Sequence, residues 1–300
     1  MGFHLSLMLC RALQELGRRD SVIAVSRFGS AESQADFAAA GCDVRPADLA
    51  DERQVASLPD VENVFFLAGI KFGSSQNPDS LRQMNVEMPR TVADRFRRSS
   101  IVALSTGCVY SFTTPESGGS TESSPTDPPG AYAESCLGRE QAFVEAGRLG
   151  TRSSIIRLNY SIDLRYGVLV DIAQAVMAGR PVDLTTGYVN VIWQGDAIAH
   201  IVQALPHAAA PPEIFNVTGA DVLRVRDLAH AFAVRFGVEA QLTGRESDTA
   251  WLNNPAKSHR LFGPPAVSTE QLVDWVADWL KRGSPTLNKP THFEARDGKY

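Results

Sequence analysis

The feature that most constrains the fold is an alternation of short apolar segments with helical patterns through the first half of the chain. Apolar segments occupy Ser21–Ser26, Val61–Ala68 and Ile101–Ser105. They are apolar along their whole length, which indicates strands buried on both faces. Helical patterns lie between them at Ala31–Ala40 and Pro78–Arg97. Strands that alternate with helices pair in parallel through right-handed crossovers, so the sequence predicts an α/β fold built on a parallel sheet.

The pattern loosens after about Asn159, which predicts a smaller second lobe. The main domain is expected over residues 1–160 and about 189–217, the lobe over about 161–188 and 218–282, and a loosely held tail over 283–300. A long loop is expected at Ser111–Gly130, which is rich in Ser, Thr, Pro and Gly. The other expected strands are Cys42–Arg45, Ser154–Leu158, Val182–Leu184, Val189–Ile192 and Ile214–Val217, and the other helices are Phe3–Leu16, Tyr132–Leu149, Val168–Ala178, Gly195–Ala204, Val225–Phe236 and Thr269–Lys281.

Composition excludes several classes of function. The 300 residues carry a net charge of −5 and no basic block, so no nucleic-acid partner is expected. No apolar run approaches the roughly 20 residues that span a bilayer, and no signal peptide is recognised, so no membrane association is expected. The four cysteines form no CxxC pair and the six histidines show no metal-ligand spacing, so we expect no metal. Free thiols suit a reducing compartment and predict a cytoplasmic protein.

Two motifs carry the chemistry. The strand at Ile101–Ser105 runs into Ser105–Tyr110 (STGCVY), and Tyr132–Glu140 (YAESCLGRE) opens a helix. Together they resemble the extended short-chain dehydrogenase/reductase family of NAD(P)-dependent epimerases and dehydratases, which carries S-[ST]-x-x-V-Y and Y-x-x-S-K-x-x-x-E. The resemblance implies a Rossmann-type doubly wound parallel sheet with a small C-terminal substrate lobe. It also implies that Tyr132 is the acid/base and that Thr106 holds the substrate oxygen.

The sequence departs from the family at Cys136, where the family has lysine. A tyrosine phenol has a pKa near 10 and needs a nearby cation to act as a base at neutral pH. Arg139, three residues further on, is expected to point to a different part of the helix, so Lys71 is the candidate substitute. Two alternatives remain: Cys136 only fills space and redox chemistry is weakened, or it is a nucleophile with a partner that lowers its pKa.

The cofactor turn is only partly present. The family has G-x-x-G-x-x-G between its first strand and first helix, where the pyrophosphate lies on the helix N-terminus. The start at Met1-Gly2-Phe3 resembles the last part of that turn, with Gly2 as the third glycine, unless Gly2 is a chance helix cap. The central first strand is missing, so we expect a truncated start and two exposed strand edges.

Other positions resemble the family's cofactor contacts. Ser26 and Arg27 end the strand after which NAD-binding members have an acidic residue, so they favour NADP over NAD, unless Arg27 is only a solvated turn residue. Asn85 matches a helix asparagine that steadies the central strands. The remaining expected cofactor contacts are Asp48, Leu49, Leu67, Ala68, Gly69, Tyr132 and Asn159.

Substrate contacts are expected from segments that border the cleft in the family. Ile156–Tyr160 resembles R-x-x-N-x-Y, which lines the nicotinamide and substrate. Polar groups beside aromatic rings suit a sugar, although ordinary loop polarity explains them equally well. The candidates are Lys71, Thr106, Asn159, Tyr188, Asn190 and Trp193.

These inferences predict an NAD(P)-dependent oxidoreductase, epimerase or dehydratase that acts on a sugar-like substrate by hydride transfer. The alternative, which Cys136 favours, is a non-catalytic dinucleotide-binding redox sensor or scaffold. A nonfunctional fragment is the third possibility. The resemblance also implies a homodimer, since helices in the regions 77–97 and 129–150 commonly pair subunits in the family.

Overall fold

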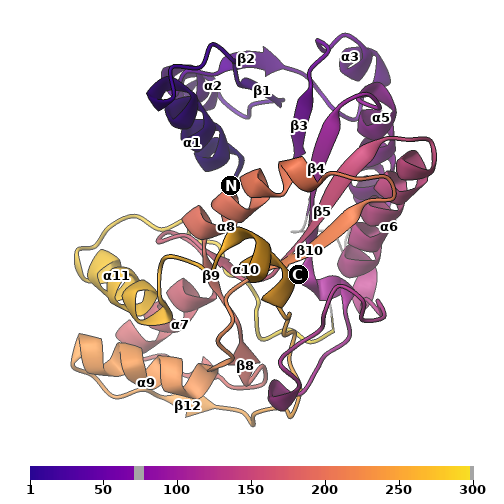
Figure 1. Ribbon diagram of the computed structural model, residues 1–300. Coiled ribbons are helices and arrows are strands. Elements are labelled where there is room, and N and C mark those ends of the chain that lie inside the picture. The colour runs from indigo at the N-terminus through magenta and orange to yellow at the C-terminus, as the bar shows by residue number, and fades with distance from the viewer. Residues whose placement is uncertain (71–77, 298–300) are drawn as a thin grey trace.

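The computed structural model describes residues 1–70 and 78–297 and has two lobes (Figure 1). The elements of the upper part are α1 (Gly2–Glu15), β1 (Ile23–Ser26), α2 (Ala31–Ala39), β2 (Asp43–Pro46), α3 (Glu52–Ala56), β3 (Asn63–Phe66), α4 (Pro78–Arg82), α5 (Met88–Arg95), β4 (Ser100–Thr106), α6 (Gly130–Arg148) and β5 (Arg152–Leu158). Those that follow are β6 (Ser161–Ile162), α7 (Val168–Met177), β7 (Val182–Asp183), β8 (Tyr188–Val189), β9 (Ile192–Trp193), α8 (Gln194–Gln203), β10 (Glu213–Val217), β11 (Leu223–Arg224), α9 (Val225–Phe236), β12 (Leu242–Thr243), α10 (Ala256–Phe262) and α11 (Thr269–Lys281).

The main sheet is parallel and has helices on both faces. Its strand order is β10-β5-β4-β3. Along β4, Ile101 and Ala103 pack with α3, α5 and α6, while Val102 packs on the opposite side with α1 and α8. Both faces of this strand are therefore buried, which is why it is apolar throughout. The predicted doubly wound α/β fold is confirmed.

The sheet is split where the first strand of the resembled family would lie. β1 pairs only with β2, and β3 pairs only with β4, among the residues that the structure describes. Figure 1 shows the β1–β2 pair at the top, apart from the larger sheet. Each of β1 and β3 thus leaves one edge unpaired, as the sequence predicted.

The lower lobe is built on helices. α7, α9 and α11 pack around Leu169, Phe232 and Val276, which are all buried. Short ladders join β7 to β12 and β8 to β11. The β6–β9 ladder follows directly on β5, so it fixes where the lobe begins relative to the main sheet.

Two expectations differ from the structure. The helix predicted over Pro78–Arg97 is interrupted by a π-helical turn at Gln83–Glu87, just before Pro89, which cannot donate a backbone hydrogen bond. The tail is not loosely held, because Phe293 is buried in the core of the lower lobe and Thr291 bonds to Asp171 of α7. No helix in the described part of the chain is both long and apolar enough to cross a bilayer.

Candidate functional site

Thr106 and Tyr132 come from the two elements that end and begin at the carboxyl edge of the sheet. Thr106 is the last residue of β4, and its Oγ1 accepts a hydrogen bond of 3.2 Å from the backbone N–H of Cys108. Tyr132 lies in the first turn of α6 and packs against a buried cluster of Val109, Tyr110 and Cys136. Cys108 also influences the pKa of Tyr132, so the structure brings both motifs to one place.

Cys136 lies one helical turn after Tyr132 and is fully buried. The two side chains share a hydrogen bond. Burial is the main cause that raises the pKa of both groups, that of Tyr132 to well above its ordinary value of 10. At neutral pH both are therefore protonated. A nucleophilic cysteine needs the opposite shift.

Arg139 corrects the expectation that it points to a different part of the helix. Seven residues are close to two turns of about 3.6 residues each, so Arg139 lies on the same face as Tyr132. Its guanidinium is buried, and it donates to the carbonyl of Leu104 (2.9 Å) and to Oδ1 of Asn85 (2.6 Å). Its charge acts to lower the pKa of Tyr132 and of Cys136, but burial outweighs it.

Gly69 is required by this guanidinium. A Cβ at position 69 would lie 2.1 Å from Nη2 of Arg139. Asn85, on the π-helical turn, joins the same cluster: its amide donates to Ser135 Oγ and to the carbonyl of Ile70. These contacts tie the end of β3 to α6, where the sequence predicted that Asn85 steadies the central strands.

A buried polar network lies beneath the motif. Glu140 of α6 forms a bidentate ion pair with Arg157 of β5, at 3.0 and 2.7 Å, and accepts a bond from Ser105 of β4. Arg157 also donates to the hydroxyl of Tyr110, which donates to Asn216 of β10. The network thus links α6 to three neighbouring strands, so it holds Tyr132 in register with Thr106.

The expected adenosine contacts lie together at the ends of β1 and β2. Ser26 is the last residue of β1, and its Oγ accepts from the N–H of Phe28. Arg27 follows, with its side chain 67% exposed and 3.9 Å from the carboxylate of Asp48. Leu49 is partly buried against the core beside α3 and α5. An exposed cation next to a hydroxyl suits an anionic group.

The other expected cofactor contacts lie at the start of α1 and just after β3. Gly2 begins α1, whose first N–H groups have no partner within a helix. A Cβ at Gly2 would lie 3.9 Å from Leu67, so no close approach there requires glycine. Leu67 packs with α1 and α8, whereas Ala68 packs on the other face of the sheet.

Asn159 and Asn190 are buried together. The amide of Asn159 donates to Oδ1 of Asn190 (2.8 Å) and to the carbonyl of Trp251, and the amide of Asn190 donates to the carbonyls of Gly219 and Asn253. Their amide protons are therefore used to join the lobe to β5. Whether they also contact cofactor or substrate stays a prediction.

Tyr188 and Trp193, two other expected substrate residues, make their recorded contacts in the lower lobe. Tyr188 lies in the β8–β11 ladder with the guanidinium of Arg224 5.9 Å from its ring. Trp193 packs edge-on against Trp275. Lys71, the proposed substitute cation, lies outside the described residues.

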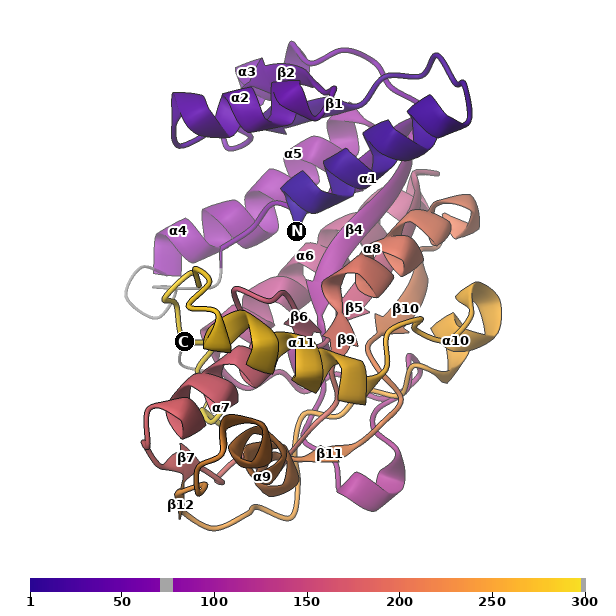
Figure 2. The same cartoon turned by 90° about the vertical axis from the view of Figure 1, so that its left-hand side faces the viewer.

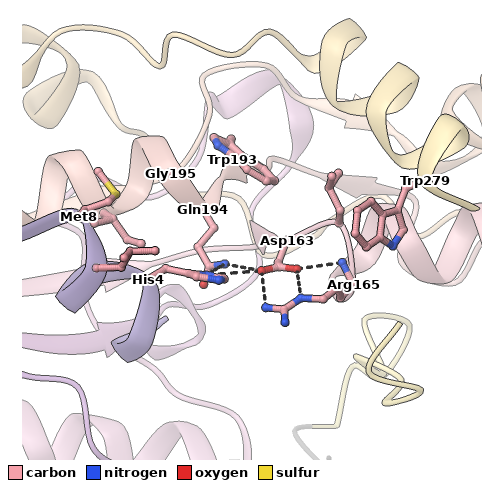
Figure 3. Close-up of a pocket in the computed structure, with 11 residues that line it drawn as sticks. His4, Met8, Asp163, Arg165, Trp193, Gln194, Gly195 and Trp279 are labelled. Carbon is pink, nitrogen blue, oxygen red and sulfur yellow. Dashed lines mark hydrogen bonds and ion pairs between the residues drawn. The ribbon is translucent and has the colours of Figure 1, made fainter. Parts of the chain in front are cut away.

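Trp193 also borders a pocket between α1, α8 and α11 (Figure 3). Asp163 is its polar centre: Arg165 donates to both carboxylate oxygens (3.0 and 3.1 Å) and Gln194 donates to one (2.8 Å). His4 of α1 lies 3.6 Å from the same carboxylate. This cluster fastens α1 to the segment after β6, a role that the histidine pattern in the sequence did not indicate.

Solved structures share this fold over nearly the whole chain. Pal from Bacillus thuringiensis superposes with a TM-score of 0.77 at 17% identity, covering 93% of this chain and 96% of Pal. UDP-glucuronic acid 4-epimerase from Bacillus cereus gives 0.76 at 16% identity, covering 92% and 95%. The dTDP-glucose 4,6-dehydratase DesIV from Streptomyces venezuelae gives 0.76 at 21% identity, covering 94% of each chain.

At these identities the likeness establishes the fold. The chain has the Rossmann-type fold found in these epimerases and dehydratases, the fold that the resemblance predicted. No protein-family profile matches the sequence, and no curated protein matches it.

Proposed function

We propose that this protein is an NAD(P)-dependent oxidoreductase, of the epimerase, dehydratase or reductase kind, that acts on a sugar or sugar-like substrate. The observation that carries the proposal is the meeting of Thr106 and Tyr132 at the carboxyl edge of the parallel sheet. Ligands in crevices at this edge are the rule for open α/β sheets. Structures with the same fold support the substrate class: the Bacillus cereus epimerase is in complex with UDP-glucuronic acid and NAD.

Two side chains would take part in the reaction, the hydroxyl of Thr106 and the phenol of Tyr132. The nicotinamide, when bound, supplies or accepts the hydride. Thr106 Oγ1 already accepts a bond from Cys108, so its proton is available to a substrate oxygen. Tyr132 is held as a neutral phenol, because burial raises its pKa. A neutral phenol donates a proton to a carbonyl oxygen more readily than it removes one from an alcohol, so carbonyl reduction is the favoured direction.

The cofactor proposed is NADP rather than NAD. The exposed guanidinium of Arg27 and the hydroxyl of Ser26 lie at the end of β1, where they would bind a 2′-phosphate. NAD is the cofactor in the epimerase complex of similar fold, so the preference has to be tested on this chain.

The first test is calorimetric titration with NADPH and with NADH. We expect NADPH to bind more tightly, and Arg27→Met to weaken NADPH binding about tenfold or more with little effect on NADH. Arg45→Met, an exposed arginine on the neighbouring strand β2, is the matched control and should change neither affinity. Absence of binding by the folded chain would refute the proposed cofactor role.

The second test concerns the tyrosine. Tyr132→Phe should lower hydride turnover by roughly 10²-fold to 10⁴-fold while cofactor affinity stays within about twofold. Cys136→Lys restores the cation of the resembled family and should raise turnover, whereas Cys136→Ala should not. Turnover that survives in Tyr132→Phe would show that another group is the acid.

The alternative is a non-catalytic dinucleotide-binding protein, a redox sensor or scaffold. It is favoured by the burial of Tyr132 and Cys136, which raises the pKa of both groups and keeps both protonated. Cofactor binding without hydride exchange, in wild type and in Cys136→Lys alike, would support it. The homodimer implied by the resemblance, a prediction that sedimentation analysis can check, applies to both functions.

A further inference from the structure

The segment after α11 follows a fixed path back toward the carboxyl edge of the sheet. Leu287 donates to the carbonyl of Arg165, and Thr291 donates to Asp171 of α7 through both its N–H (2.8 Å) and its hydroxyl (2.6 Å). Phe293 is buried in the core of the lower lobe. In Figure 2 this yellow segment turns back from the end of α11 at the level of α7. Residues 291–297 are therefore positioned by anchors on both sides of their path.

Arg296 is the end of that path. Its Nη1 and Nη2 donate to the carbonyl and hydroxyl of Thr249, at 2.6 and 2.8 Å. Its guanidinium carbon lies 4.0 Å from the centre of the Phe112 ring, whose centre is 4.5 Å from that of the Trp251 ring at a tilt of 34°. Phe112 belongs to the loop that leaves β4 after Thr106, so Arg296 lies against the loop that directly follows the proposed substrate anchor.

The electrostatic surroundings of Arg296 connect it to the same edge of the sheet. Tyr160 directly follows Asn159 at the end of β5, and burial raises its pKa. The Cys108 thiol raises the pKa of Tyr160 further, and the charge of Arg296 opposes this. Three elements, the ends of β4 and β5 and the tail, thus meet around one cation.

That cation has no anionic partner in the part of the chain that the structure describes. The carboxylate of Glu294 is also close enough to raise the pKa of Tyr160. This carboxylate pairs with His292, whose Nδ1 lies 3.7 Å away, and forms no ion pair with Arg296 among the described residues. Burial is the largest cause that lowers the pKa of Arg296, and Tyr160 acts in the opposite direction. Its Nε donates to no described atom.

We propose that Arg296 binds an anionic group of the substrate, a carboxylate or a phosphate. A guanidinium recognises both through paired N–H donors, and Thr249 and Phe112 fix its plane in advance. The ring of Phe112, packed against Trp251, is an apolar surface beside it. That the anion belongs to a substrate rests on the proposed function, whereas the anion site itself does not. The competing explanation is that Arg296 only fastens the tail to Thr249.

The test is calorimetric titration of the full chain, without cofactor, with pyrophosphate and separately with glucuronate. These probes distinguish a phosphate from a carboxylate. The proteins are wild type, Arg296→Met, Arg296→Lys and Arg260→Met, an exposed arginine of α10 that serves as the control. Thermal unfolding of each protein verifies that it is folded.

We expect wild type to bind one probe and Arg296→Met to bind it at least about tenfold more weakly, with Arg260→Met unchanged. Arg296→Lys keeps the charge but loses the planar fork, so it should fall between them, and it serves as the test if Arg296→Met does not fold. Binding unaffected in both Arg296 variants, or absent in wild type, would overturn the proposal. Because no cofactor is present, a failure of the proposed hydride transfer would leave this result unchanged.

Discussion

The β1–β2 unit and the four-stranded sheet carry the two halves of one proposed crevice, yet they are stabilised very differently. β4 is buried along nearly its whole length and is locked to α6 by the Glu140–Arg157 pair. β1 has one fully buried residue, Ala24, in a small cluster with Phe28 and Cys42. The proposed chemical groups therefore lie on a rigid frame, and the proposed adenosine contacts lie on a unit with an open edge. The difference teaches that cofactor binding and folding of the N-terminal unit should be coupled.

The largest expected effect is a loss of stability when the buried ion pair between α6 and β5 is broken. Glu140→Gln leaves the Arg157 charge buried without its partner and should lower the free energy of unfolding by about 3–5 kcal/mol. Asp278→Asn, which removes an exposed ion pair with Arg282, should cost less than about 1 kcal/mol. Urea unfolding of both variants makes the comparison. Equal losses would mean that the buried network does not stabilise the frame.

Hydrogen exchange compares the two regions directly. The amides of β1 (Ile23–Ser26) should exchange on the order of a hundredfold faster than those of β4 (Ser100–Thr106), since β1 opens with its small unit and β4 only with the whole domain. Mass spectrometry of exchanged peptides measures both in one sample. Saturating NADPH should reduce the difference between the exchange rates of β1 and β4 if NADPH binds at the ends of β1 and β2 as proposed. Equal rates in the free protein would refute the picture of a weakly held unit.

A smaller change tests the junction between β3 and α6. Gly69→Ala places a methyl group 2.1 Å from Arg139 and should cost about 1–3 kcal/mol of stability through forced rearrangement. Gly29→Ala, in the N-terminal unit, meets no atom within 4 Å and should stay within about 0.5 kcal/mol of wild type. A Gly69→Ala variant as stable as wild type would show that the Arg139 guanidinium can move without a loss of stability.

The smallest expected effect is a pH dependence at the contact between α1 and Asp163. Burial, its largest cause, lowers the pKa of His4 in the folded protein, although Asp163 opposes this. Above about pH 6.5 the ring is neutral in both states and contributes nothing. As the pH falls below that value the unfolded chain binds the proton more tightly, so stability declines. The half-exposed ring keeps the loss below about 1 kcal/mol.

His4→Gln should remove that part of the acid sensitivity. The measurement is the free energy of unfolding of both proteins at about pH 7.5 and about pH 5.5. A variant whose stability falls as steeply as that of wild type would assign the effect to other histidines, such as the buried His200.

The sequence predicted most of the fold because strand periodicity and crossover rules are local. Ile101–Ser105 is a strand that is buried except at Leu104, which is partly buried, so its apolar pattern was readable. The two unpaired strand edges were predicted from the partial glycine turn at Met1–Phe3 and the resemblance to the family. Less of the candidate site could be predicted from the sequence. Arg139 was misplaced although its spacing from Tyr132, two helical turns, was readable. Arg296 could not be found, because nothing local indicates that a chain end returns to Phe112 from 184 positions away, the difference between residue numbers 296 and 112.

The contact between Gly69 and Arg139 has a consequence for sequence variation. A side chain at position 69 and the Arg139 guanidinium compete for the same space, so substitutions at the two positions should be coupled. In natural variants of this protein, any residue larger than glycine at 69 should therefore appear together with a shorter residue at 139. A library that randomises both positions and selects for folded protein should recover that pairing, with arginine found almost only beside glycine.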